Sequence, residues 1–114
     1  MCDKQEFFQL EGLAADAFLE QVGNEDFASY VDGALGSRFT RITNLKDPVP
    51  ILPGRFMGFR HPSGEAHIDE GEVWMWCPGQ DNPDTRCSVG DTPNILEADV
   101  GDHDGPYNGI IIGC

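Results

Sequence analysis

Glycine and proline divide this sequence into short segments. There are 14 glycines and 8 prolines among its 114 residues, and both residue types end or bend regular secondary structure. Prolines are densest at residues 44–54, where Pro48, Pro50 and Pro53 exclude a regular helix or strand. A hydrophobic content of 39% is nevertheless typical of a globular chain. We therefore expect one small domain with many turns, short strands and little long helix.

The charge of the chain excludes several classes of partner. It carries 7 basic and 20 acidic residues, a formal net charge of −13, so phosphate backbones would repel it and we expect no nucleic-acid partner. Its apolar runs are short, as at residues 110–112, and no membrane span is expected. The first residues contain no basic start followed by an apolar stretch, so no signal peptide is visible.

Two segments in the first third of the chain have helical periodicity. Between residues 10 and 22, apolar side chains recur every three or four positions. The second helix is predicted to begin after Asn24, which can cap it, and to end at Gly36. Glu25 and Asp26 would lie in its first turn, where carboxylates favour the helix dipole.

A strand and a hairpin are predicted further along. Residues 38–43 are rich in β-branched and aromatic side chains and predict a strand that leads into the proline-rich loop. Residues 66–68 and 72–76 flank a turn-forming sequence, Asp69-Glu70-Gly71, and predict an antiparallel hairpin. Together with the helices, these elements indicate an α/β chain with a long, loop-rich tail.

The four cysteines allow two interpretations. Cys77 and Cys87 bracket a polar, turn-rich stretch that has no core-forming side chain to hold it closed. A disulfide between them would close that loop, and we favour this interpretation; the alternative is a set of scattered reduced thiols. A zinc site is not expected, because no CxxC pair occurs and no histidine lies at ligand spacing from either cysteine.

One carboxylate and one imidazole suggest hydrolytic chemistry. Asp47 lies in the proline-rich loop after the predicted strand, and His103 lies in a late acidic loop. A carboxylate can hold an imidazole in the tautomer that takes a proton from a nucleophile. Spacing alone does not establish this pairing, and the sequence offers no nucleophile, because none of its serines has the GxSxG frame.

Four stretches in order give the chain a family resemblance. They are VGNEDFASYV at 22–31, RITNLKDPVPILP at 41–53, GFRHPSGE at 58–65, and the closing segment around Asp102, His103, Tyr107 and Gly109. In this order and spacing they resemble the carboxyl-terminal half of the fungal class 3 lipases, the family of triacylglycerol lipases and feruloyl esterases. The resemblance covers residues 22–114, whereas residues 1–21 do not match the family and are expected to form a separate, helical segment.

The resemblance implies a partial α/β-hydrolase fold: helix, parallel strand, antiparallel hairpin and loop-rich tail. It implies ester hydrolysis in lipid metabolism by a secreted Ser-His-Asp enzyme, with Asp47 as the triad acid and His103 as the general base. It also places Cys77 and Cys87 where some members bridge the same loop. No cofactor or metal is expected. The substrate of the full-length parent would be a lipid or another ester.

The absence of a nucleophile leaves three hypotheses. The first is a truncated lipase-like product, inactive alone because no acyl-enzyme can form without the serine. The second is a non-catalytic, acidic, disulfide-stapled binding module derived from a lipase scaffold. The third is an esterase completed by a separate fragment that bears the serine. In the first case a half-sheet with an open edge would self-associate.

Overall fold

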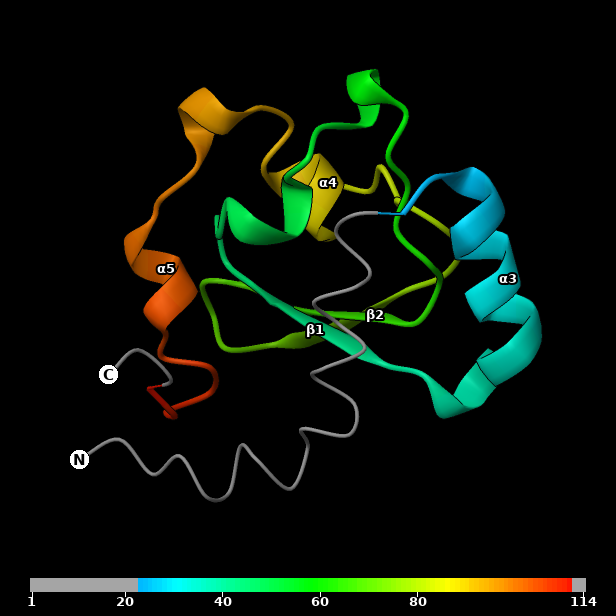
Figure 1. The fold of residues 1–114 in the computed structure, drawn as a ribbon. Helices are drawn as coiled ribbons and strands as arrows, with labels where there is room; N and C mark the ends of the chain where they lie inside the picture. Colours follow the sequence, from blue (N-terminus) through cyan, green and yellow to red (C-terminus); the bar gives the residue numbers. More distant parts are fainter. Residues whose placement is uncertain (1–22, 112–114) are drawn as a thin grey trace.

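A computed structural model describes residues 23–111 of the chain (Figure 1). The helix predicted for 10–22 and the separate segment predicted for 1–21 lie outside the described residues. The described chain contains three α-helices and three strands. They are α3 (Glu25–Leu35), β1 (Arg41–Asn44), β2 (Glu65–Ile68), β3 (Trp74–Cys77), α4 (Ser88–Asp91) and α5 (Gly101–Asp104). Single 3-10 turns fill much of the remainder, at Gly36–Arg38, Val49–Ile51, Arg55–Met57 and Ile95–Glu97.

Helix α3 confirms the prediction for residues 24–36. The Asn24 side chain accepts a hydrogen bond of 2.9 Å from the Phe27 amide and caps the first turn. Gly36 ends the helix with a positive φ of 53°. Only Ala28 is fully buried in this helix, and Tyr30 is 72% exposed. Helix α3 therefore lies at the side of the molecule rather than in its core (Figure 1).

The first strand begins later than the sequence predicts. The strand expected at 38–43 is observed as Arg41–Asn44, because the chain first makes a 3-10 turn. The Arg38 guanidinium donates to the carbonyl oxygens of Ala34 and Leu35, at 2.8 and 3.4 Å. It thereby satisfies carbonyls that the end of α3 leaves without helical partners. Arg38 thus belongs to the helix terminus.

The three strands form one mixed sheet in the order β1-β2-β3. Strand β1 pairs with β2 in parallel, and β2 pairs with β3 antiparallel. The hairpin predicted around Asp69 is confirmed: Asp69 Oδ1 accepts hydrogen bonds from the amides of Gly71 and Val73, at 2.8 and 3.0 Å. The described chain is therefore a small α/β unit. None of its helices is long and apolar enough to cross a bilayer.

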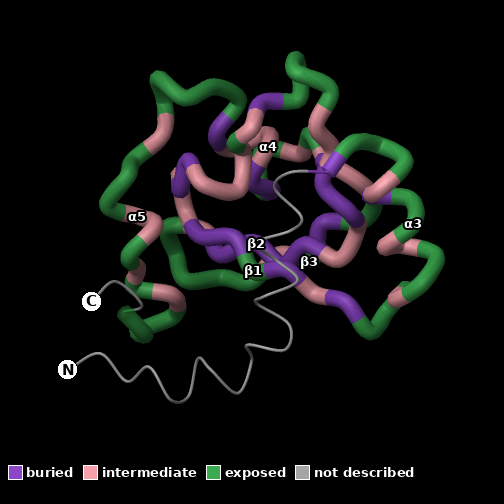
Figure 2. Tube along the Cα trace, viewed as in Figure 1, coloured by how far each residue is buried: buried purple, intermediate pink, exposed green. Residues whose placement is uncertain are grey.

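The two faces of this sheet differ in chemistry. Side chains of paired residues share a face, so Ile42 and Trp76 flank Ala66, while Trp74 lies beside Ile68. Ile42 is 42% exposed and Trp76 is 66% exposed. The opposite face is buried and largely polar, and α4 packs there through the Ser88 amide, which donates to the Glu65 carboxylate. Figure 2 shows buried residues along β1 and β2.

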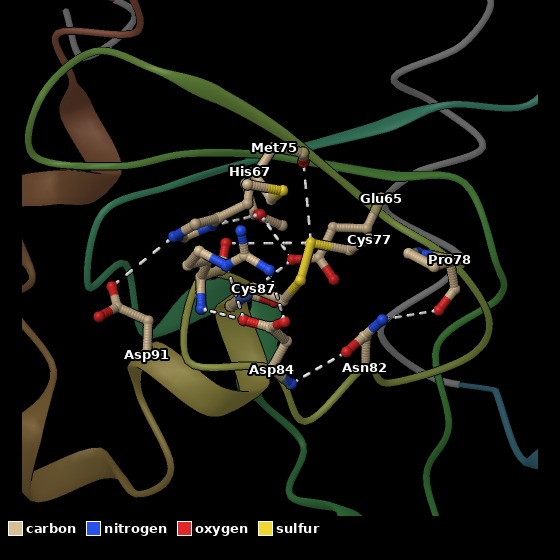
Figure 3. The surroundings of a disulfide bond; sticks show 12 residues. Glu65, His67, Met75, Cys77, Pro78, Asn82, Asp84, Cys87 and Asp91 are labelled. Carbon is tan, nitrogen blue, oxygen red and sulfur yellow. Dashed lines mark hydrogen bonds and ion pairs between the residues drawn. A yellow bond between two sulfur atoms is a disulfide. The ribbon is translucent and has the colours of Figure 1, made fainter.

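The disulfide predicted between Cys77 and Cys87 is present. It joins the end of β3 to the residue that precedes α4, and Figure 3 shows it among the polar side chains below the sheet. Both cysteines are buried. The bridge therefore fixes α4 against the polar face of the sheet.

Candidate active site

Asp47 lies just beyond the carboxyl end of β1. The chain leaves the strand through a tight turn, in which the Asp47 amide donates to the Asn44 carbonyl at 3.0 Å. The Asp47 side chain is buried, and its Oδ1 accepts a hydrogen bond of 2.8 Å from the Val49 amide. Pro48 precedes the 3-10 turn Val49–Ile51. The bond from Val49 orients the carboxylate, and Pro48 restricts the backbone of the same turn.

His103 comes from α5 and meets this carboxylate. Its Nδ1 lies 3.0 Å from Asp47 Oδ2, and the imidazole side chain is 44% exposed. Within the described residues, Nε2 has no hydrogen-bond partner. An ionised carboxylate can only accept, so Nδ1 carries the proton and the Nε2 lone pair is available on the more exposed side of the pair.

Tyr107 adds a second donor to the same carboxylate oxygen. Its hydroxyl lies 3.2 Å from Asp47 Oδ2 and 3.3 Å from the His103 carbonyl oxygen. Burial, followed by the charge of Asp47, raises the pKa of Tyr107 above its ordinary value of 10. The phenol therefore keeps its proton and acts as a hydrogen-bond donor at physiological pH.

Further hydrogen bonds join the loop of Asp47 to the loop of His103. The Lys46 amide donates to Asp102 Oδ2 at 3.0 Å, and the Asn44 side-chain amide donates to the Asp102 carbonyl at 3.0 Å. The Asp99 amide donates to the Lys46 carbonyl at 2.8 Å. Burial, together with the neighbouring carboxylates, raises the pKa of Asp102. These bonds hold the pair together independently of the contact between the two side chains.

The serines do not complete a catalytic triad in the described chain. Ser63 donates its hydroxyl to Asp32 at 2.9 Å, and Ser88 lies at the start of α4 beside Glu65. Neither forms a hydrogen bond with the His103 ring. Among the described residues there is also no group of three or more metal-ligating side chains that could hold an ion. The arrangement can hold and move a proton, but it presents no attacking hydroxyl.

A second imidazole and carboxylate pair was missed by the sequence reasoning. His61 is buried, and its Nδ1 lies 2.7 Å from Asp81 Oδ1. Burial alone would raise the pKa of Asp81, but its bonds with His61 and the charge of Arg55 lower it overall. Asp81 lies inside the disulfide-closed loop. Only long-range packing reveals this pair, and no spacing in the sequence marks it.

Comparison with known proteins supports the resemblance drawn from the motifs. The chain is 34% and 36% identical, over 98 residues each, to two secreted mono- and diacylglycerol lipases of Malassezia globosa. It is 36% identical over 92 residues to secreted mono- and diacylglycerol lipase 3 of Gibberella zeae. These matches cover 84%, 84% and 76% of the chain. No protein-family model matches it.

All three of these proteins are named as secreted lipases. The chain is similar to them over most of its own length, in agreement with the resemblance of the four motifs. It spans about a third of the length of the curated relatives that it matches, 31% for the Malassezia globosa proteins and 29% for the Gibberella zeae protein.

Proposed function

We propose that this chain supplies the acid and the base of a Ser-His-Asp triad to a secreted lipid-ester hydrolase of the α/β-hydrolase fold. The observation that carries the proposal is the 3.0 Å contact between His103 Nδ1 and Asp47 Oδ2. A mixed sheet with the carboxylate after a parallel strand is consistent with that fold. A structural disulfide agrees with an extracellular location.

The proposed mechanism uses His103 as the proton carrier. Asp47 accepts a hydrogen bond from Nδ1–H of His103, so the Nε2 lone pair is free to take the proton of an attacking serine. Asp47 then stabilises the imidazolium, and Nε2 returns the proton to the leaving alcohol. The names of the relatives support mono- and diacylglycerols as the substrates. The catalysed step is therefore cleavage of a glycerol ester.

The serine of this mechanism is not supplied by the 114 residues. No serine among them has glycine two positions before and two positions after it, and no acyl-enzyme forms without a nucleophile. We therefore propose that the chain alone does not hydrolyse esters. Activity requires a serine-bearing segment that docks beside Asp47 and His103.

An ester assay on the chain, alone and reconstituted, tests this proposal. The chain is incubated with a short p-nitrophenyl ester, first by itself and then with the remainder of a Malassezia globosa relative. We expect turnover only in the mixture. His103→Ala abolishes it, and Asp47→Asn lowers it by about 10⁴-fold, the loss typical of a triad acid. Asp104→Asn, a neighbouring exposed carboxylate, is the matched control and retains activity.

Two results would contradict the proposal. Turnover by the isolated chain that His103→Ala removes would show that the chain contains its own nucleophile. Reconstituted turnover that survives His103→Ala would remove the imidazole from the mechanism. The second result would favour the non-catalytic binding module, for which the exposed tryptophans Trp74 and Trp76 offer a contact surface.

A further inference from the structure

A third histidine, His67, lies in the polar network beneath the sheet and takes no part in the proposed triad. It belongs to β2 and is almost completely buried. Its Nδ1 lies 2.8 Å from the Thr43 hydroxyl, and its Nε2 lies 3.6 Å from Asp91 Oδ2 in α4. Figure 3 shows His67 directed toward Asp91 beside the disulfide. Among the described residues, Nε2 has no hydrogen-bond partner.

The hydrogen bonds of Glu65 determine where the protons of this network lie. Glu65 accepts from Arg41 at 3.1 Å, from the Thr43 hydroxyl at 2.8 Å and from the Ser88 amide at 2.9 Å. Burial by itself would raise the pKa of Glu65, but the Arg41 charge and the bonds from Ser88 and Thr43 outweigh it and lower the pKa. Glu65 is therefore ionised and can only accept.

This assignment fixes the tautomer of His67. A threonine hydroxyl has one proton, and Thr43 donates it to Glu65. The proton in the 2.8 Å contact between Thr43 and His67 must then belong to His67 Nδ1. In the neutral ring, Nε2 is left as a bare lone pair that faces the Asp91 carboxylate, which explains why this contact is long.

We propose that His67 is a pH-dependent switch that joins the sheet to α4. Above its titration range the neutral ring donates from Nδ1 to Thr43 and makes no bond to Asp91. Uptake of a proton at Nε2 converts the 3.6 Å contact into a hydrogen-bonded ion pair with Asp91. Helix α4 follows Cys87 directly, so the new bond also ties the disulfide-closed loop to β2.

The groups around His67 determine the pH range in which this switch operates. Burial lowers the pKa of His67 below its ordinary 6.5, while Glu65, Asp91 and Asp69 oppose that effect. Arg41 lies behind Glu65 and neutralises it. Met75 of β3, the register partner of His67, is uncharged. The ion pair therefore forms only in moderately acidic solution.

Nitrogen-15 NMR of the full chain tests the switch. The ring signals of His67 are assigned by their loss in His67→Gln. We expect a protonated Nδ1 and a bare Nε2 at neutral pH, and a titration midpoint below 6.5. The amide signals of Asp91 and Thr92 should follow the same titration. Asp91→Asn should lower the midpoint by roughly half a unit or more, whereas the exposed control Asp104→Asn should leave it unchanged.

Variants of Thr43 test whether its hydroxyl, rather than burial alone, determines the tautomer of His67. Thr43→Val removes the hydroxyl and should increase the population with the proton on Nε2, whereas Thr43→Ser should preserve the native tautomer. A bare Nδ1 in the unmodified chain, or an unchanged His67 titration in Asp91→Asn, would overturn the proposal. If Thr43→Val does not fold, the tautomer of the unmodified chain and the His67 titration in Asp91→Asn still test the proposal.

Discussion

His103 Nδ1 lies 3.0 Å from Asp47 Oδ2, although 56 residues separate the two in the chain. The same carboxylate oxygen also accepts the Tyr107 hydroxyl at 3.2 Å. Asp47 therefore has three donors in total, because the Val49 amide occupies its other oxygen. These three hydrogen bonds hold the buried carboxylate in a single orientation.

Removing the phenol of Tyr107 should weaken the link between the two loops. We expect Tyr107→Phe to lower the free energy of unfolding by about 1–3 kcal/mol, since a partly buried hydrogen bond to a charged group is lost. Urea denaturation monitored by circular dichroism measures the change. Tyr30→Phe is the control, because Tyr30 is exposed and no bond of its hydroxyl would be removed. Equal effects of the two substitutions would contradict the role given to Tyr107.

Loss of the disulfide should destabilise the chain. Cys77 and Cys87 are separated by 10 positions, and opening a loop of that size costs about 2.5–3 kcal/mol in the chain-entropy model. We expect Cys77→Ala combined with Cys87→Ala to lower the urea midpoint by a corresponding amount. Reduction of the unmodified chain should also lower the midpoint. A midpoint that does not respond to reduction would show that the bridge contributes no stability.

Stability should fall in acid in two stages. The pKa of His67 is lowered in the folded chain, so the unfolded chain takes up a proton first and stability decreases as the pH falls below about 6.5. The pKa values of Glu65 and Asp81 are also lowered, so their contributions are present above the unfolded values and are lost as the pH falls below about 4. Urea denaturation from pH 8 to pH 3 measures both stages.

Two substitutions test which residues cause these two losses of stability. Glu65→Gln breaks the buried pair with Arg41 and should cost about 3–5 kcal/mol at pH 7. It should also make the curve flatter below pH 4. His67→Gln should remove the stage near pH 6. A curve for Glu65→Gln parallel to that of the unmodified chain would assign the acid stage to other carboxylates.

The chain should self-associate through β1. In the described residues β1 pairs only with β2, so its other edge is open, and the adjoining face carries Ile42 and Trp76. We expect oligomers in sedimentation velocity, and Ile42→Lys should shift them toward monomer because a charge on an edge strand opposes pairing. Leu96→Lys changes an exposed apolar residue elsewhere and serves as the control. A monodisperse, cooperatively melting monomer would contradict this prediction.

The sequence by itself determined the local elements. Asn24 and Gly36 mark the ends of α3, the turn at Asp69 joins the hairpin, and the polar loop between Cys77 and Cys87 favoured a bridge. Each of these depends on the conformational preferences of a few neighbouring residues. The same reasoning placed the first strand too early, because it could not detect that Arg38 bonds to the carbonyls at the end of α3.

Only the tertiary structure decided which polar groups meet. The sequence and its family resemblance named Asp47 and His103 as a pair, but the contact depends on the bonds that join the turn after β1 to α5. The buried pair of His61 and Asp81, and the contact of His67 with Asp91, had no signal in the sequence. Local propensity extends over a few residues, whereas pairing of buried charges arises when distant segments pack together and exclude water, so that each polar group requires a partner.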